Sequence, residues 1–110
     1  MSFRILQLNS LIQRELGHAF LTEVSLHPNV LTTITKVETS RDLEQAKIWI
    51  SIFPLEKGQI ILKTLQKNKG RLQSFLNARL RLKKIPHLKF VLDTTEVKVE
   101  RINKLLDAEA

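Results

Sequence analysis

Apolar residues near the start of the chain recur at helical spacing. Over residues 4–21 this stripe consists of Ile5, Leu8, Ile12, Leu16 and Ala19. Because side chains three and four positions apart share one face of a helix, the pattern predicts an amphipathic helix here. His27-Pro28-Asn29 then breaks the chain, since proline disfavours helical backbone at the residue before it.

The next two segments have the composition and alternation of strands. Residues 30–39 are rich in Thr, Val and Ile, whose branched side chains suit a pleated surface. Over residues 45–53, Ile48, Ile50 and Ile52 alternate with polar or aromatic residues. Ser40-Arg41-Asp42 is typical of a turn, with Asp42 capping it through its side chain, so the short connection predicts an antiparallel hairpin.

A helix is predicted to start at residues 54–56 and to run to about Lys67. Asn68-Lys69-Gly70 should interrupt it, because Asn and Gly both tolerate left-handed backbone. A further helix follows, and Pro86 ends that segment. Its buried side is predicted to hold Leu72, Phe75, Leu76 and Leu80. Alternation over residues 88–92 then predicts a third strand.

The C-terminal residues 94–110 form an appendage in this interpretation. Thr94 or Thr95 can cap a last helix, with Asp93 as a second capping side chain, although the alternation of Val97 and Val99 leaves a strand open. The order helix, strand, strand, helix, broken helix, strand predicts a two-layer α+β sandwich. With 110 residues, we expect a single domain over residues 1–110.

Charge is distributed unevenly along the chain. The sequence has 18 Lys and Arg against 11 Asp and Glu, a net charge of +7. Ten basic residues and no acidic one lie between Lys57 and Leu92, so the rest of the chain is net negative. Such a segment favours a polyanionic partner, above all a phosphate backbone, because neutralised phosphates release condensed counterions.

The candidate RNA-binding residues come from this basic segment. Lys63 and Lys67 are four apart and so share a helix face, and an ordinary solvated face would mix both signs of charge. Gly70 can either admit a phosphate close to the backbone or act as a helix C-cap that turns the chain. The full set is Lys57, Lys63, Lys67, Asn68, Lys69, Gly70, Arg71, Arg79, Arg81, Lys83 and Lys84.

Several classes of function are disfavoured. The chain has no cysteine, its three histidines are scattered, and it has no phosphate-binding Gly-Lys-Ser/Thr loop or paired carboxylates, so we expect no metal, cofactor or catalytic site. No apolar stretch is long enough to span a bilayer, and Met1 is not followed by a signal peptide. We therefore expect a cytoplasmic monomer without a membrane partner.

Two segments resemble the ribosome-binding factor A family. One is Val37-Glu38-Thr39-Ser40-Arg41-Asp42-Leu43-Glu44-Gln45-Ala46-Lys47-Ile48, and the other is Leu82-Lys83-Lys84-Ile85-Pro86-His87-Leu88-Lys89-Phe90-Val91-Leu92-Asp93. The helix, interruption and helix around Gly70 is similar as well, so the likeness spans nearly the whole chain. The family's usual Ala-x-Gly kink would correspond to Asn68-Lys69-Gly70, with Asn at the alanine position.

The resemblance implies a type II KH-like fold and a non-catalytic ribosome assembly factor. It also implies the partners: the small (30S) ribosomal subunit and its 16S rRNA or rRNA precursor, during late maturation and rRNA processing, often in growth in the cold. One alternative is a protein-interaction module that uses the open sheet face around Trp49, which can otherwise stack on RNA or pack within the chain. A small enzyme acting on RNA is the other alternative.

Overall fold

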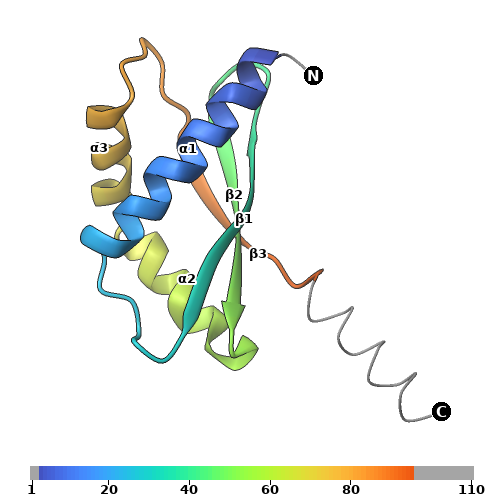
Figure 1. Cartoon of the computed structure of the whole chain (residues 1–110), viewed down its shortest axis with the longest axis vertical. Coiled ribbons are helices and arrows are strands. Elements are labelled where there is room, and N and C mark those ends of the chain that lie inside the picture. Colours follow the sequence, from blue (N-terminus) through green and yellow to red (C-terminus); the bar gives the residue numbers. More distant parts are fainter. Residues whose placement is uncertain (1–2, 96–110) are drawn as a thin grey trace, which may run out of the picture.

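The order of elements agrees with the prediction from the sequence. The structure, a computed structural model, describes residues 3–95, and the C-terminal appendage predicted from residue 94 lies almost entirely outside them. Within residues 3–95 it contains three α-helices, one 3-10 helix and a three-stranded sheet (Figure 1). They follow in the order α1 (Phe3–Thr22), β1 (Leu31–Thr39), β2 (Gln45–Phe53), η1 (Leu55–Lys57), α2 (Gly58–Lys67), α3 (Lys69–Arg79) and β3 (His87–Leu92).

The sheet has β2 at its centre. β1 runs antiparallel to β2, with Leu31 opposite Phe53 and Thr39 opposite Ala46, which confirms the hairpin. β3 runs parallel to β2, with His87 opposite Gln45. A parallel neighbour needs a long crossover, and α2 and α3 supply it.

A β-bulge at Thr35 changes which side chains of β1 face the core. Ile34 is paired with Ile50 and Lys36 with Trp49, so Thr35 is the extra residue. Before the bulge the even positions are the more buried ones, and after it Val37 and Thr39 are. The sequence pattern did not reveal this bulge, because Thr at several positions in a row hides the change of phase.

The core lies between one face of the sheet and the helices. Ile48, Ile50 and Ile52 of β2 are buried, as their alternation predicts, and they pack with apolar side chains of α1, α2 and α3. Figure 1 shows these helices together on one side of the strands. Among residues 3–95, no helix covers the opposite sheet face, which bears Trp49 and is called the open sheet face below. None of the helices in residues 3–95 is long and apolar enough to cross a bilayer.

Two carboxylates secure the ends of the strands. Asp42 Oδ1 accepts hydrogen bonds from Ser40 Oγ at 2.6 Å and from the Glu44 N–H at 3.0 Å, which confirms its capping role in the β1–β2 turn. Asp93 accepts from the Thr35 hydroxyl at 2.6 Å and from the Thr95 N–H at 2.9 Å, so it ties the bulge to the end of β3.

These hydrogen bonds predict a loss of stability in acid. The Ser40 hydroxyl lowers the pKa of Asp42, and the Thr35 hydroxyl lowers the pKa of Asp93, both below the usual 3.8. A lowered folded-state pKa means that the stabilisation is present above the unfolded value and is lost as the pH falls through the folded value. Urea unfolding should therefore show a falling free energy of unfolding from about pH 5 downward. Asp42→Asn with Asp93→Asn should flatten that slope, and an unchanged slope would contradict the assignment.

Candidate RNA interface

The exposed face of α2 carries its lysines. Ile61 and Leu65 are buried in the core, which turns Lys63 and Lys67 outward, where both side chains are exposed. Their spacing of four places them on one face, as predicted. The helix thus presents two neighbouring ammonium groups to the solvent.

The junction between α2 and α3 is a kink at a single residue. Asn68 has φ −97° and ψ 12°, and its side-chain Nδ2 donates to the Thr64 carbonyl at 2.8 Å, while its own carbonyl accepts from the Leu72 N–H at 3.0 Å. The Thr64 carbonyl also accepts from the backbone N–H of Asn68 at 3.1 Å, so the backbone and the side chain of Asn68 both bind the last turn of α2. The expected three-residue interruption is therefore too long, because Lys69 already begins α3. Asn68 is therefore the kink residue, and its side-chain amide nitrogen is hydrogen-bonded to a backbone carbonyl.

Gly70 lies inside α3 and does not turn the chain. No glycine in the described residues has positive φ, so the helix C-cap interpretation of Gly70 is wrong. A Cβ added at Gly70 would meet no atom within 4 Å. The space beside its backbone is open to a ligand, whereas the conformation itself does not require glycine.

Replacing Gly70 with alanine should stabilise the domain. Alanine is the better helix former by up to about 1 kcal/mol, and nothing opposes its methyl group. Gly58→Ala is the matched control, because its Cβ would lie 3.2 Å from Leu92 Cδ2 and force that side chain to shift. Urea denaturation should show a higher midpoint for Gly70→Ala and none of that gain for Gly58→Ala. An equal gain in both variants would contradict this account.

The first turn of α3 concentrates positive charge at an unfavourable place. Lys69 and Arg71 are both exposed there, and the turn holds no acidic residue. The N-terminus of a helix is the positive end of its dipole, so cations there cost stability unless an anion binds. One guanidinium nitrogen of Arg71 also donates to the Glu23 carbonyl at 3.3 Å, which ties this turn to the end of α1.

A shallow hollow of about 380 Å³ lies beside the kink. Asn68 and Arg71 line it together with residues 21–25 at the end of α1.

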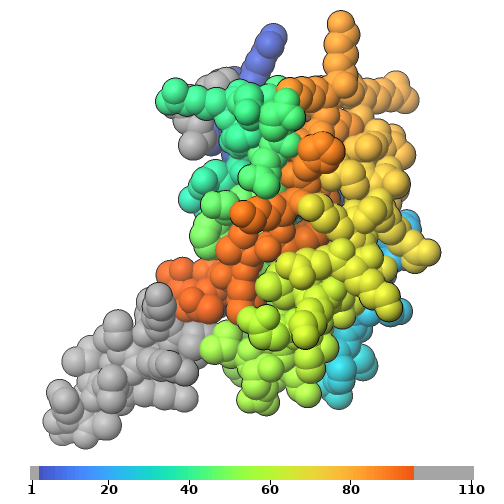
Figure 2. Space-filling model, turned by 180° about the vertical axis from the view of Figure 1, so that it is seen from behind, coloured from blue at the N-terminus to red at the C-terminus, as the bar shows by residue number. Residues whose placement is uncertain are grey.

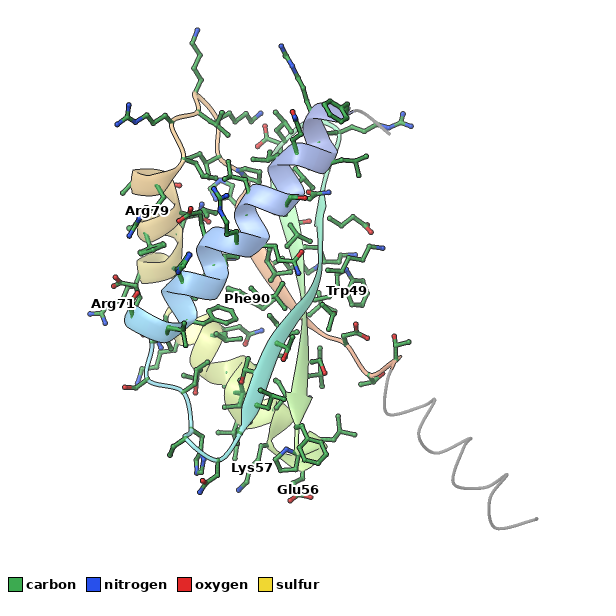
Figure 3. The ribbon with its side chains drawn as sticks, viewed as in Figure 1. Trp49, Glu56, Lys57, Arg71, Arg79 and Phe90 are labelled. Carbon is green, nitrogen blue, oxygen red and sulfur yellow. The ribbon has the colours of Figure 1, made fainter. Side chains whose placement is uncertain are left out.

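Arg79 lies further along α3, with its guanidinium 4.9 Å from the centre of the Phe75 ring, which is only partly buried. Figure 3 shows Arg71 and Arg79 projecting outward from the same side of α3.

The loop between α3 and β3 presents Arg81, Lys83 and Lys84, all exposed. Gln73 fixes the end of this loop: its Nε2 donates to the Pro86 carbonyl at 3.1 Å and its Oε1 accepts from the Leu88 N–H at 3.1 Å. Lys84 forms an ion pair with Glu44 of the β1–β2 turn. The role of Gln73 could not be read from the sequence, because a glutamine on a helix carries no positional signal.

The segment without acidic residues covers one continuous face. Figure 2 shows α2, α3, their following loop and β3 side by side on the face seen from behind. The predicted cations do not form one patch on it, however. Figure 3 places Lys57, which is half-buried, at the far end of the molecule beside Glu56 and away from Arg71 and Arg79. Among residues 3–95, Lys84 is the only predicted cation with a carboxylate within salt-bridge distance.

Trp49 lies on the open sheet face and is half-buried. The Lys47 ammonium is 5.6 Å from the centre of its ring, and its indole nitrogen is buried without a hydrogen-bond partner among the described residues. A ring flanked in this way packs within the chain over the sheet face, and packing within the chain was one of the expected roles. The other aromatic residue of β2 is the exposed Phe53, which lies four positions further along the strand. Trp49 therefore has no adjacent aromatic ring on β2 with which to form a stacking platform.

Fold and surface together define a class of protein. The chain is a small α+β domain of the type II KH-like kind with a cationic helix–kink–helix unit. Its sequence matches the family described as Ribosome-binding factor A over residues 4–106. Ribosome-binding factor A of Thioalkalivibrio sulfidiphilus is 40% identical over 99 residues, which cover 87% of this chain and 75% of that protein. The chain therefore belongs to the ribosome-binding factor A family.

Solved structures agree with this assignment. The crystal structure of ribosome-binding factor A from Thermus thermophilus superposes with a TM-score of 0.68 at 25% identity, covering 80% of this chain and 93% of that one. A homology model of the Thermus thermophilus protein, fitted into a cryo-electron microscopy map of a 30S complex, gives a TM-score of 0.66 at 24% identity, covering 78% and 91%. At that identity the second likeness shows the shared fold alone.

Proposed function

We propose that this chain is a ribosome assembly factor that binds the small ribosomal subunit through phosphate groups of 16S rRNA or its precursor. One observation carries the proposal: residues 57–92 hold ten cations and no acid, and four of these cations, Lys63, Lys67, Lys69 and Arg71, are exposed along α2 and the first turn of α3. Membership of the ribosome-binding factor A family points to the same partner, and the Thermus thermophilus relative is described in a 30S complex.

The first turn of α3 is the proposed centre of this contact. Lys69 and Arg71 add charge to the positive end of the helix, and Gly70 leaves room beside the backbone. A phosphate there would be bound by charge and by the N–H groups of the turn. Lys63 and Lys67 would contact phosphates further along, while Asn68 acts by shaping the kink.

Contacts of this kind recognise the shape of folded RNA. Phosphate contacts position a protein without reading bases, and the described surface offers no row of aromatic side chains for stacking. We therefore propose that specificity comes from the tertiary fold of the subunit RNA. The protein would hold an immature conformation late in maturation and rRNA processing, without catalysis, and leave when the RNA docks correctly. The cytoplasm and growth in the cold are the setting that the family implies.

The test is the salt dependence of binding to purified small subunits. Each neutralised phosphate contributes roughly 0.7 to 0.9 to the slope of log affinity against log salt concentration. Co-sedimentation over a salt series should thus give a steep negative slope, which identifies an RNA contact. A slope near zero would favour the second candidate, a protein contact through the sheet face around Trp49, and no co-sedimentation at low salt would refute the function.

A further inference from the structure

A groove of about 640 Å³ lies at the end of the molecule where α1 begins. Figure 1 shows the start of α1, the β1–β2 turn and the α3–β3 loop meeting at this end. The floor of the groove is aliphatic, formed by Ile5, Leu8, Leu11, Leu43 and Leu82. The groove is of the size of a ligand pocket, and the phosphate contacts proposed above make no use of its apolar floor.

The rim of the groove is positively charged. Arg4, Arg41, Lys83 and Lys84 line it, and no acidic residue does. Lys84 is neutralised by Glu44, whereas the other three have no carboxylate within salt-bridge distance among residues 3–95. Three segments far apart in the sequence thus bring unneutralised cations to the edge of one apolar hollow.

Two leucines are held toward the groove at a cost. Leu43 has φ 61°, a left-handed conformation that is unfavourable for a residue with a side chain. Leu82 is 47% exposed although it is a large aliphatic residue. An apolar ligand that covers Leu82 would remove this exposed aliphatic surface from water, which is favourable.

We propose that this groove binds an acidic segment of a protein, in which one or two Leu, Ile or Val side chains are flanked by Asp or Glu. Aliphatic side chains would fill the floor, and the flanking carboxylates would pair with Arg4, Arg41 and Lys83. RNA suits the groove less well, since no lining side chain is aromatic and Gln7 is the only uncharged polar one that could read a base edge.

The inference rests on the proposed function, because it places the acidic segment in a protein of the small subunit. The groove is distinct from the turn that begins α3, because the hollow beside that turn is lined by Asn68, Arg71 and residues 21–25, none of which lines the groove. The chain would then hold RNA through α2 and α3 and protein through the groove. Lys83, predicted as an RNA contact, would serve the protein contact instead, whereas Lys84 stays paired with Glu44.

Photo-crosslinking on purified small subunits tests the groove. Leu82→p-benzoylphenylalanine places the probe on the groove floor, Gln7→p-benzoylphenylalanine repeats it from α1, and Lys63→p-benzoylphenylalanine is the control on α2. After co-sedimentation and irradiation, we expect the probes at residues 82 and 7 to capture a protein segment rich in Asp and Glu with aliphatic residues among them. The probe at residue 63 should capture 16S rRNA.

The experiment separates failure of the groove assignment from failure of the proposed function. If the protein sediments with the subunit but the groove probes capture RNA, a segment without acidic residues, or nothing, the groove assignment is wrong and the proposed function stands. If the protein does not sediment, both fail. Arg4→Glu with Arg41→Glu should lower the yield at residue 82 about tenfold and leave that at residue 63 unchanged, and equal yields in this variant would also overturn the assignment.

Discussion

Neutralising Lys63, Lys67, Lys69 and Arg71 together, each to glutamine, is expected to weaken binding to small subunits by roughly a thousandfold. The estimate assumes about 1 kcal/mol for each exposed phosphate contact. The slope of log affinity against log salt should become shallower by roughly 3. Binding isotherms on purified subunits at several salt concentrations measure both quantities.

The same variant should fold normally. All four side chains are exposed, and removing cations from the first turn of α3 relieves an unfavourable interaction with the helix dipole. The variant also loses the 3.3 Å hydrogen bond from Arg71 to the Glu23 carbonyl, which offsets this gain, so the thermal midpoint should stay about the same. Lys36→Gln with Lys47→Gln is the control, because these lysines lie on β1 and β2. If that pair weakens binding as much as the quadruple change, the cationic helix face is not the binding surface.

Leu72→Ala is expected to produce the largest loss of stability among the single changes considered. Leu72 is fully buried in the first helical turn after the kink and packs in the core cluster. Such a truncation costs about 2–5 kcal/mol because a cavity remains. The thermal midpoint should fall by roughly 10–30 °C in a domain of this size.

Leu21→Ala makes the same chemical change at a residue that is 83% exposed. It should alter the midpoint very little, because its side chain is already in water in the folded state. Thermal unfolding followed by circular dichroism compares the two variants directly. Similar losses would mean that the packing of α3 against the sheet does not determine the stability of the domain.

The fold could be predicted from the sequence wherever apolar spacing is regular. The stripe of α1 and the alternation of β2 each dictate one buried face, and the structure has both. The sequence pattern did not predict the bulge at Thr35 or the single-residue kink at Asn68, for a shared reason. Each involves a side-chain hydrogen bond, from Thr35 to Asp93 and from Asn68 to the Thr64 carbonyl, which periodicity does not record.

The candidate site was predictable only as a segment of the chain. A run of cations without acids marks residues 57–92, but helical spacing cannot say that Lys57 lies apart from Arg71. Nor could it show that Arg4 and Arg41 meet Lys83 at one groove, since they are separated by most of the sequence. Those positions follow from the tertiary arrangement of the α1 start, the hairpin turn and the α3–β3 loop.

The parallel pairing of β3 with β2 has a consequence for how the chain folds. The hairpin joins residues close in sequence, whereas His87 must find Gln45 42 positions earlier. Loop-closure entropy makes such distant contacts slow to form. We expect the hairpin to form early and β3 to dock late, after both crossover helices, so that a nascent chain leaves the β2 edge unpaired until residue 92 has been synthesised.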